Sequence, residues 1–525
     1  MMTLEKFEEA SELVKKVTNP TKLIYSEYLS AQTGAKVYLK PENMQHTGAY
    51  KIRGAYYKIS TLTDEERSRG LITASAGNHA QGVAFAAKQF GCKATIVMPT
   101  VTPLIKVNRT KSFGADVVLH GDVYDDAYAY ACKLAEENGY TFVHPFNDLD
   151  VATGQGTIAM DIVQELTTVD YILAPIGGGG LITGVSTLAK MLNPKIKVIG
   201  VEPAEAASMT AALKAGAPVK LDSANTIADG TAVKEIGDKN LPYVQENVDD
   251  ILLVEDDELI GAFLDMVENH KMVVENSGLL TVAALKQLDC KGKKVVSVLS
   301  GGNMDVITMS SIVQHGLIQR DRIFSVSVLL PDKPGELVKV AQTIAEEQGN
   351  VIKLEHNQFV SINRNAAVEL RVTLEAFGTD HKNRIIAALA RGIVVTEAKQ
   401  KSGTLITVEH GLNLGKEIFA VPGRIDDTLS EGCNQLIKAG AKLVMQPSDI
   451  LDEFGILARE YKKNNITLDN SEKVVYASIC LVPRSADEIA LMTGMEVQNV
   501  IHNLISMELK GIIHSVGKNQ YVLNI

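Results

Sequence analysis

Lys51 lies in the segment 47–55 (TGAYKIRGA), directly after the aromatic residue Tyr50. An uncharged lysine amine can form a Schiff base with an aldehyde, and a neighbouring aromatic ring can pack on a flat cofactor. The alternative is a solvated surface cation, which is the state of most lysines. The segment by itself leaves both interpretations open.

Three further segments combine small residues with polar ones. Residues 75–82 read SAGNHAQG, residues 177–181 read GGGGL, and residues 300–303 read SGGN. The first two precede predicted helices, and backbone N–H groups at a helix N-terminus attract anions such as a carboxylate or a phosphate. The hydroxyl of Ser300 could bond to a ring nitrogen. Each segment is also compatible with an ordinary turn.

Strands and helices are predicted to alternate from residue 37 to about residue 320. This alternation indicates an α/β fold with mostly parallel sheets. Ligands of such sheets bind at the carboxyl ends of the strands, where the glycine-containing segments fall, so we expect these segments to meet at one site. The expected strands are 37–39, 94–98, 117–119, 171–174, 198–201 and 295–299, and the expected helices are 80–90, 125–138 and 156–166.

Taken together, these segments resemble the fold-type II pyridoxal-phosphate enzymes, in particular the threonine dehydratases (threonine ammonia-lyases). Residues 144–147 (HPFN), 154–157 (GQGT) and 226–230 (TIADG) add to the resemblance. The resemblance extends over residues 1–320, and it implies a pyridoxal-phosphate-dependent catalytic domain of two open α/β lobes there.

The resemblance also implies a role for each segment. Lys51 would hold the cofactor, pyridoxal 5'-phosphate, as a Schiff base beside Tyr50. Asn78 would bond to the 3-hydroxyl of the cofactor, and Ser300 to its pyridine nitrogen. Its phosphate would bind to Gly177, Gly178, Gly179, Gly180 and Leu181. The carboxylate of the substrate would bind to Ser75, Ala76, Gly77, Asn78 and His79.

The implied reaction is the β-elimination of L-threonine to 2-oxobutanoate and ammonia. The amine of Lys51, released by the substrate, would remove the α-proton before the β-hydroxyl leaves. Serine-preferring dehydratases and serine racemases are similar and stay as alternatives. Racemases carry a second serine where this chain has Ala76, which has no proton to return to the α-carbon. No metal site is expected, because Ser208 stands where the resemblance requires a carboxylate near Glu202.

Residues 321–397 follow a βαββαβ pattern, which predicts a ferredoxin-like unit. The unit resembles an ACT domain, with Asp332-Lys333-Pro334-Gly335 at its first turn. This resemblance implies feedback regulation by isoleucine or valine, and a dimerisation unit that binds no ligand is the alternative. The expected strands are 324–330, 350–355, 367–374 and 393–397, and the expected helices are 336–347 and 382–390.

Residues 395–407 (VTEAKQKSGTLIT), 417–423 (EIFAVPG) and 430–434 (SEGCN) carry a further resemblance, to the C-terminal part of the DNA-processing protein A family. The resemblance predicts a partial Rossmann segment over 398–465 and a winged-helix domain over 466–525. The strand at 393–397 could end the preceding unit or begin this one. The expected recognition helix, 498–507, has neither Lys nor Arg, so DNA binding is not expected. A single-stranded DNA-binding module in residues 398–525 is the alternative from another functional class.

Composition and charge narrow the functional class. The chain has 525 residues and a net charge of −11, which disfavours nucleic-acid binding by the whole surface. Its five cysteines are scattered without a C-x-x-C pair, as is typical of the reducing cytoplasm. The N-terminus has no apolar signal segment, and the uncharged run 171–189 contains Pro175 and four glycines, which disfavour a membrane span. We therefore expect a cytoplasmic protein without membrane contact; the resemblance implies a homo-oligomer.

Overall fold

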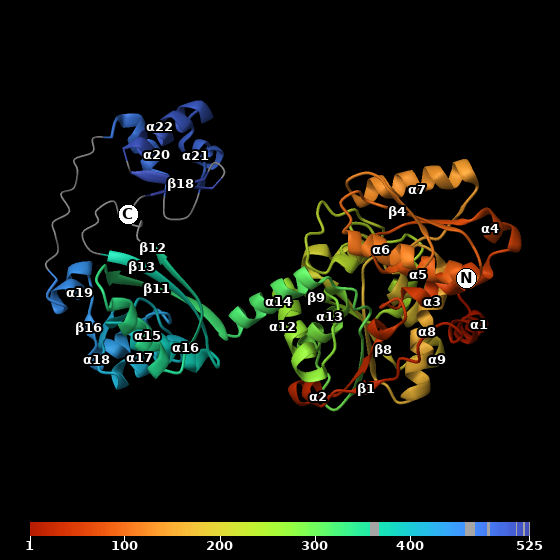
Figure 1. Ribbon diagram of the computed structural model, residues 1–525, viewed down its shortest axis with the longest axis horizontal. Helices are drawn as coiled ribbons and strands as arrows, with labels where there is room; N and C mark the ends of the chain where they lie inside the picture. The colour runs from red at the N-terminus through yellow and green to blue at the C-terminus, as the bar shows by residue number, and fades with distance from the viewer. Residues whose placement is uncertain (358–366, 457–467, 480–483, 511, 518–519, 524–525) are drawn as a thin grey trace. The chain divides into compact units, whose positions relative to one another are not determined.

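The computed structural model of the chain contains two compact units, Met1–Leu389 and Ala390–Ile525. Figure 1 shows their helices and strands. The structure describes residues 1–357, 367–456, 468–479, 484–510, 512–517 and 520–523. Across these described residues, no helix is long and apolar enough to cross a membrane.

The larger sheet of the first unit has six strands in the order β1-β2-β10-β7-β8-β9. Every neighbouring pair is parallel except β1–β2. Because β10 and β7 are parallel neighbours, the segments that follow them, which begin at Leu299 and Ile176, emerge at the same edge of the sheet. The strands are β1 (Ile24–Tyr25), β2 (Lys36–Lys40), β7 (Tyr171–Pro175), β8 (Lys197–Pro203), β9 (Asp250–Val254) and β10 (Lys294–Val298).

A second sheet of four parallel strands has the order β5-β4-β3-β6. The segment 75–79 follows β3 directly, at the carboxyl edge of this sheet. The two sheets confirm the predicted α/β class with mostly parallel strands. Their strands are β3 (Leu71–Ala74), β4 (Ala94–Met98), β5 (Asp116–Leu119) and β6 (Thr141–Phe142).

Helices connect and cover these strands. The helix predicted at 156–166 is longer than expected, because the carboxylate of Asp148 accepts hydrogen bonds from the N–H groups of Asp150 and Val151 and so starts α8 seven residues earlier. The helices are α1 (Leu4–Val14), α2 (Glu27–Thr33), α3 (Lys51–Thr61), α4 (Asp64–Arg69), α5 (Asn78–Gln89), α6 (Leu104–Ser112), α7 (Tyr124–Asn138), α8 (Leu149–Glu165), α9 (Gly180–Leu192), α10 (Ser208–Ala215), α11 (Leu241–Asn247), α12 (Asp256–Asp265), α13 (Asn276–Ala283) and α14 (Val306–Gln319).

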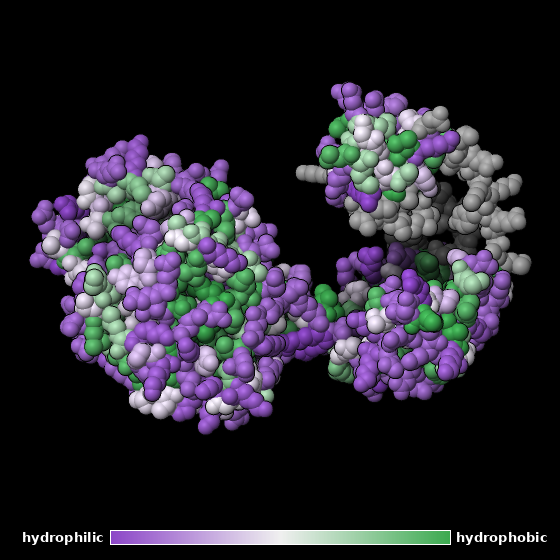
Figure 2. All heavy atoms as spheres, turned by 180° about the vertical axis from the view of Figure 1, so that it is seen from behind, coloured by the Kyte–Doolittle hydropathy of each residue, from purple (hydrophilic) through white to green (hydrophobic). Residues whose placement is uncertain are grey.

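Close packing of α8 against α9 fixes the core beside the larger sheet. A Cβ atom at Gly184 would lie 2.0 Å from the carbonyl oxygen of Ala152, so only glycine permits this approach. Apolar side chains from β7, β8, α8 and α9 fill the space between sheet and helices. Hydrophilic side chains cover much of the visible surface of this unit, with hydrophobic ones gathered near the middle of the face (Figure 2).

The last part of the first unit has a three-stranded antiparallel sheet in the order β11-β13-β12, with two helices. The prediction of a four-stranded βαββαβ unit ending at residue 397 is wrong. The expected fourth strand is β14 (Gly392–Val395), which pairs with β15 (Glu417–Ala420) in the next sheet. The elements are β11 (Ile323–Pro331), α15 (Glu336–Glu346), β12 (Asn350–Asn357), β13 (Ala367–Glu375) and α16 (Thr379–Leu389).

The second unit contains two small folds. The first is a parallel sheet in the order β14-β15-β16, so the unit begins at residue 390 rather than 398. The second has, in its described residues, three helices and a three-stranded sheet in the order β17-β19-β18, and its assignment as a winged helix stays a prediction. The remaining elements are β16 (Lys442–Leu443), α17 (Gly403–Asn413), α18 (Glu431–Lys438), α19 (Pro447–Glu453), α20 (Asn470–Ala477), α21 (Ala486–Thr493), α22 (Val497–Leu509), β17 (Arg484–Ser485), β18 (Ile513–Gly517) and β19 (Gln520–Leu523). The polar sequence of residues 460–471 predicts a linker, and most of this stretch lies outside the described residues.

Candidate active site

Lys51 is the first residue of α3, and its amine lies inside the first unit. Its Nζ donates a hydrogen bond to the carbonyl oxygen of Pro145 at 2.7 Å and lies 5.4 Å from the centre of the Tyr50 ring. Burial lowers the pKa of Lys51 from 10.5 to about 8, although the nearby charge of Glu275 opposes this shift. The amine is therefore far easier to deprotonate near neutral pH than an ordinary lysine.

The four glycines form the turn between β7 and α9. Gly179 has a φ of +94°, and a Cβ atom at Gly178 would lie 2.2 Å from the Phe146 ring, so both positions require glycine. In the described part of the chain, the backbone N–H groups of Gly177, Gly178 and Gly179 donate to no protein acceptor. Together with the N-terminus of α9, these free donors form a site for an anion such as a phosphate.

Pro145 and Phe146 join the lysine to the glycine turn. Pro145 accepts the bond from Lys51, and Phe146 packs on Gly178. The amide of Asn240 secures this arrangement by donating to the carbonyl oxygens of Phe146 at 3.1 Å and Gly178 at 2.8 Å. Sequence reasoning missed Asn240, because no pattern in the sequence links it to segments about 60 and 95 residues away.

The Asn78 side chain is held at both ends. Its Nδ2 donates to the carboxylate of Glu275 at 2.7 Å, and its Oδ1 accepts from Nδ2 of Asn303 at 2.7 Å. The backbone N–H of Asn303 donates to the same carboxylate at 3.2 Å. This triangle fixes the orientation of the amide of Asn78. Burial raises the pKa of Glu275 to about 7, with the charge of Asp229 adding to the effect.

The roles of Glu275 and Asn303 were not predicted from the sequence. Asn303 is the last residue of the segment 300–303, of which only Ser300 was assigned a role. Glu275 is 6% exposed, and a buried carboxylate of this kind cannot be recognised before the fold is known. The one indication in the sequence was Asn303, the polar residue that ends the SGGN segment.

Ser300 and the segment 75–79 lie around the same centre. Ser300 is 3% exposed, and its carbonyl oxygen accepts a bond from the N–H of Tyr50 at 3.0 Å. The next residue, Gly301, lies against both Glu275 and Asn78, since a Cβ atom there would be 2.3 and 3.0 Å from their side-chain atoms. The structure therefore brings the SGGN segment, the lysine and Asn78 together, as the sequence predicted.

Within the segment 75–79, the side chains differ in exposure. The Ser75 hydroxyl accepts a bond from the N–H of Gly77 at 3.2 Å, and the Ala76 side chain packs on the core behind the second sheet. His79 is 3% exposed, and its Nε2 lies 2.9 Å from the carbonyl oxygen of Val143. Burial, with the charge of Lys51, lowers the pKa of His79 to about 3, so its ring is uncharged at neutral pH.

Arg53 anchors the helix that begins with Lys51. It is 2% exposed and bonds to the carboxylates of Glu42 at 2.8 Å and Asp161 at 2.7 Å. Lys40 adds a second buried cation, 3.1 Å from Asp161. The four charges balance, and they tie α3 to β2 and α8.

Glu202 caps a helix in this structure. Its carboxylate accepts bonds from the N–H groups of Met209 and Thr210 and from the hydroxyl of Thr210, at 2.6 to 2.9 Å. Its oxygens thus serve the start of α10, which gives this buried carboxylate a structural role.

The features of the site fit pyridoxal 5'-phosphate. A lysine with a lowered pKa is suited to hold an aldehyde, and the glycine turn offers unpaired N–H groups to a phosphate. A family model described as pyridoxal-phosphate dependent enzyme matches residues 14–301, which include Lys51 and the glycine turn. The chain belongs to this family.

Comparison with known proteins extends the likeness beyond the site. The chain is 44% identical over 397 residues to an L-threonine ammonia-lyase of Thermotoga maritima, covering 75% of this chain and 99% of the relative. It is 42% identical to one of Geobacter sulfurreducens over 392 residues, covering 74% and 97%. Among solved structures, threonine deaminase isoform 2 of Solanum lycopersicum is similar with a TM-score of 0.57 and 38% identity, covering 60% of this chain and 94% of that one.

A serine racemase and a second family model are also similar to parts of the chain. The maize serine racemase structure has a TM-score of 0.57 and 34% identity, covering 61% of this pyridoxal-phosphate-dependent enzyme and 98% of the racemase. A family model described as DNA recombination-mediator protein A matches residues 369–455, which include the β14-β15-β16 sheet.

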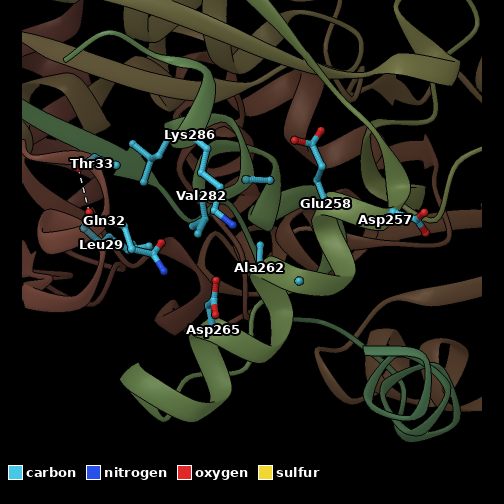
Figure 3. Close-up of a pocket in the computed structure, with 12 residues that line it drawn as sticks. Leu29, Gln32, Thr33, Asp257, Glu258, Ala262, Asp265, Val282 and Lys286 are labelled. Atoms are coloured by element: carbon cyan, nitrogen blue, oxygen red, sulfur yellow. Dashed lines mark hydrogen bonds between the residues drawn. The ribbon is translucent and has the colours of Figure 1, made fainter. Parts of the chain in front are cut away.

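A separate cavity of about 160 Å³ lies between α2, α12 and α13 (Figure 3). It contains none of the predicted site residues. Asp265 forms part of its wall and accepts bonds from the Tyr28 hydroxyl at 2.8 Å and from Arg320 at 2.6 Å. Arg320 lies between α14 and β11. Its bond to Asp265 therefore links this wall of the cavity to the connection that leads to the three-stranded sheet.

The lowered pKa of Lys51 predicts a pH dependence for capture of the cofactor. Only the neutral amine attacks an aldehyde, so the rate at which the apoprotein binds pyridoxal phosphate should rise with pH through about 8 and then level off. Visible absorbance after mixing measures this rate. In Glu275→Gln, loss of the negative charge that favours the ammonium form should move the inflection to lower pH. An inflection at 10.5, the ordinary value for lysine, would contradict the prediction.

Proposed function

We propose that this chain is a threonine ammonia-lyase that converts L-threonine to 2-oxobutanoate and ammonia. The observation that carries the proposal is the Lys51 amine, whose pKa is lowered to about 8 and which is joined through Pro145 and Phe146 to the glycine turn. The names of the Thermotoga maritima and Geobacter sulfurreducens relatives support threonine as the substrate.

Each part of the site would have a separate task. When bound, pyridoxal phosphate supplies the electron sink that stabilises the charge left by the α-proton. Lys51 holds the cofactor and, once free, removes that proton at its Nζ. Gly177 to Leu181 would bind its phosphate, Ser300 would bond to its pyridine nitrogen, and Tyr50 would pack beside its ring.

Asn78 and its neighbours would orient the two ligands. Glu275 and Asn303 fix the orientation of the Asn78 amide, and this amide would bond to the 3-hydroxyl of the cofactor. The segment from Ser75 to His79 binds the substrate carboxylate through its backbone N–H groups and hydroxyl, at the start of α5. A neutral His79 donates no proton to the product, which agrees with elimination.

Serine racemase activity is the second candidate, because the maize serine racemase is similar over 61% of this chain. Racemisation needs a proton donor on the face of the α-carbon opposite Lys51. Ala76 offers none at the position where the resemblance places a second serine. We therefore favour elimination over racemisation.

The test uses the full-length protein with pyridoxal phosphate. We expect 2-oxobutanoate from L-threonine, a slower yield of pyruvate from L-serine, and no D-serine. Keto acids are measured by reduction with a coupled dehydrogenase, and D-serine by chiral chromatography. A yellow protein that forms D-serine faster than keto acid would contradict the proposal.

We also propose that the three-stranded part regulates the enzyme as an ACT domain that binds isoleucine or valine. The two residues Arg320 and Asp321, which lie between α14 and β11, form ion pairs in two directions. Arg320 bonds to Asp265 at 2.6 Å and to Glu268 at 2.9 Å, whereas Asp321 accepts a bond from Lys382 of α16 at 2.6 Å. A change in α16 on effector binding would therefore reach α12.

The contact with α12 leads on to the active site. A π-helical turn, Met266–His270, follows α12, and Glu275 lies five residues beyond it. Such turns often mark functional segments of helices. Added L-isoleucine or L-valine should lower the rate in the same threonine assay.

The second unit adds no activity in this proposal. Its helix α22 has neither Lys nor Arg, which gives DNA phosphates no cation on that helix. We further propose a cytoplasmic location, on the evidence of the scattered cysteines.

A further inference from the structure

The side chain of Gln155, in α8, is buried in the first unit with its amide unpaired. It is 0% exposed, and neither Nε2 nor Oε1 has a hydrogen-bond partner among the residues that the structure describes. An unpaired buried amide is costly, because the group gives up its bonds to water without replacing them. This state of Gln155 indicates a partner that binds from outside the chain.

Other buried amides of the first unit use their donor atoms. The amide N–H groups donate to backbone carbonyl oxygens at 2.8 to 3.2 Å in Gln45, Asn240 and Asn276. Within the described part of the chain, Gln155 is the one amide side chain whose two polar atoms are both buried and unpaired. The fold therefore satisfies such donors elsewhere and leaves this one free.

The free amide lies at the start of α9, beside the glycine turn. A Cβ atom at Gly180, the first residue of α9, would lie 3.2 Å from Oε1 of Gln155. On the other side, a Cβ atom at Gly54 would lie 2.9 Å from Cγ of Gln155, and Gly54 is one turn beyond Lys51 in α3. The two glycines thus leave room for a side chain that extends from α8 between the helix of Lys51 and the glycine turn.

A phosphate is the ligand group that matches this donor. At the same helix start, the backbone N–H groups of residues 177–179 have no protein acceptor in the described part of the chain, and a helix N-terminus favours an anion. A phosphate dianion has acceptor oxygens only, so it bonds to Nε2 rather than to Oε1. A half-turn of the amide exchanges these two atoms without changing its shape. Because glutamine is neutral, its burial carries no charge penalty before the cofactor binds.

We propose that Gln155 is a further ligand of the cofactor and that its Nε2 donates a hydrogen bond to the phosphate, beside the backbone N–H groups of the glycine turn. This inference rests on the proposed binding of the phosphate at residues 177–181. A hydrogen bond between a buried donor and a charged acceptor is among the stronger kinds. Gln155 then adds to the affinity through the phosphate alone, and not through the ring or through Lys51.

Binding of two forms of the cofactor to the full-length apoprotein tests the inference. Pyridoxal 5'-phosphate and pyridoxal share the ring and the aldehyde, so the dissociation constant of pyridoxal divided by that of pyridoxal phosphate measures the preference for the phosphate. Visible absorbance titrations give both constants. In Gln155→Leu, which removes the amide and keeps a side chain of similar size, we expect this ratio to fall by about ten-fold or more while pyridoxal binds as before.

The matched control is Gln164→Leu. Gln164 is an exposed residue of the same helix, α8, so this variant should keep the ratio of the wild type. Thermal unfolding is the second readout. Without cofactor, Gln155→Leu should unfold at or above the temperature of the wild type, because an apolar group replaces an unpaired amide. With the same excess of pyridoxal phosphate, its unfolding temperature should rise less than that of the wild type.

The outcomes separate this inference from the function on which it rests. A lower ratio in Gln155→Leu, with the ratio unchanged in Gln164→Leu, supports the inference. An unchanged ratio in Gln155→Leu, an equal loss of affinity for both ligands, or a less stable apoprotein would give Gln155 a purely structural role and overturn the inference. A wild-type protein that binds pyridoxal as tightly as pyridoxal phosphate would contradict the phosphate site itself, and the inference with it.

Discussion

Replacing Lys51 with alanine is expected to give a folded protein without visible cofactor absorbance and with an elimination rate reduced by about 10³-fold or more. The loss is large because one amine both holds the cofactor and moves the α-proton. The side chain makes one hydrogen bond, to Pro145, so its removal should disturb the surrounding packing little. Visible spectra and the threonine assay measure the two effects.

The matched control for this variant is Lys88→Ala. Lys88 lies in α5, the helix that follows the segment 75–79, and its side chain is exposed. We expect this variant to keep the absorbance and the rate of the wild type. Retention of both properties by Lys51→Ala would show that another group holds the cofactor.

Replacing Arg53 with methionine is expected to cost about 3–5 kcal/mol of unfolding free energy. Methionine keeps the apolar stem but leaves the buried carboxylates of Glu42 and Asp161 with Lys40 as their one remaining cationic partner in this cluster. Burial disfavours the charge of Arg53, yet the two carboxylates more than offset this and raise its pKa. Without the guanidinium, the same carboxylates lose their main cationic partner and lower the free energy of unfolding.

Urea unfolding of the full-length protein measures the loss of unfolding free energy in Arg53→Met, with the transition of the first unit as the readout. Arg69→Met is the matched control. Arg69 makes a half-exposed ion pair with Glu65 at 3.5 Å, so the same substitution there should change the free energy by about 0.5 kcal/mol or less. Equal effects at the two positions would show that the buried cluster contributes little. A destabilised α3 should also weaken cofactor binding in Arg53→Met, since Lys51 begins that helix.

Much of the site could be predicted because it is made of short contiguous segments. Lys51 with Tyr50, the glycine turn and Ser300 each follow or begin a regular element, so their local pattern indicates where they lie. Parallel strands bring the ends of such segments to one edge whatever the distance in sequence. The cofactor prediction is confirmed by the family to which the chain belongs, whereas the individual residue roles stay predictions.

Other parts of the site could not be predicted in this way. Glu275, Asn303 and Asn240 act through contacts with residues 62 to 225 positions away. The shift in the pKa of Lys51 is likewise absent from the sequence, because it arises from burial by several distant segments. Only the folded chain creates the environment that changes these groups.

Residues 392–397 show what the sequence alone determines and what only the tertiary structure decides. The apolar run by itself determined that a strand lies there, and the sequence pattern determined the α/β class and the turn formed by the four glycines, whereas the role of Lys51 as the cofactor lysine stays a prediction. The apolar run left open which sheet the strand joins, because a run of β-branched residues fits either one. Tertiary structure decided this, by placing Gly392–Val395 in register with Glu417–Ala420. Strand pairing depends on which unpaired edge lies within hydrogen-bonding distance, a property of the whole fold.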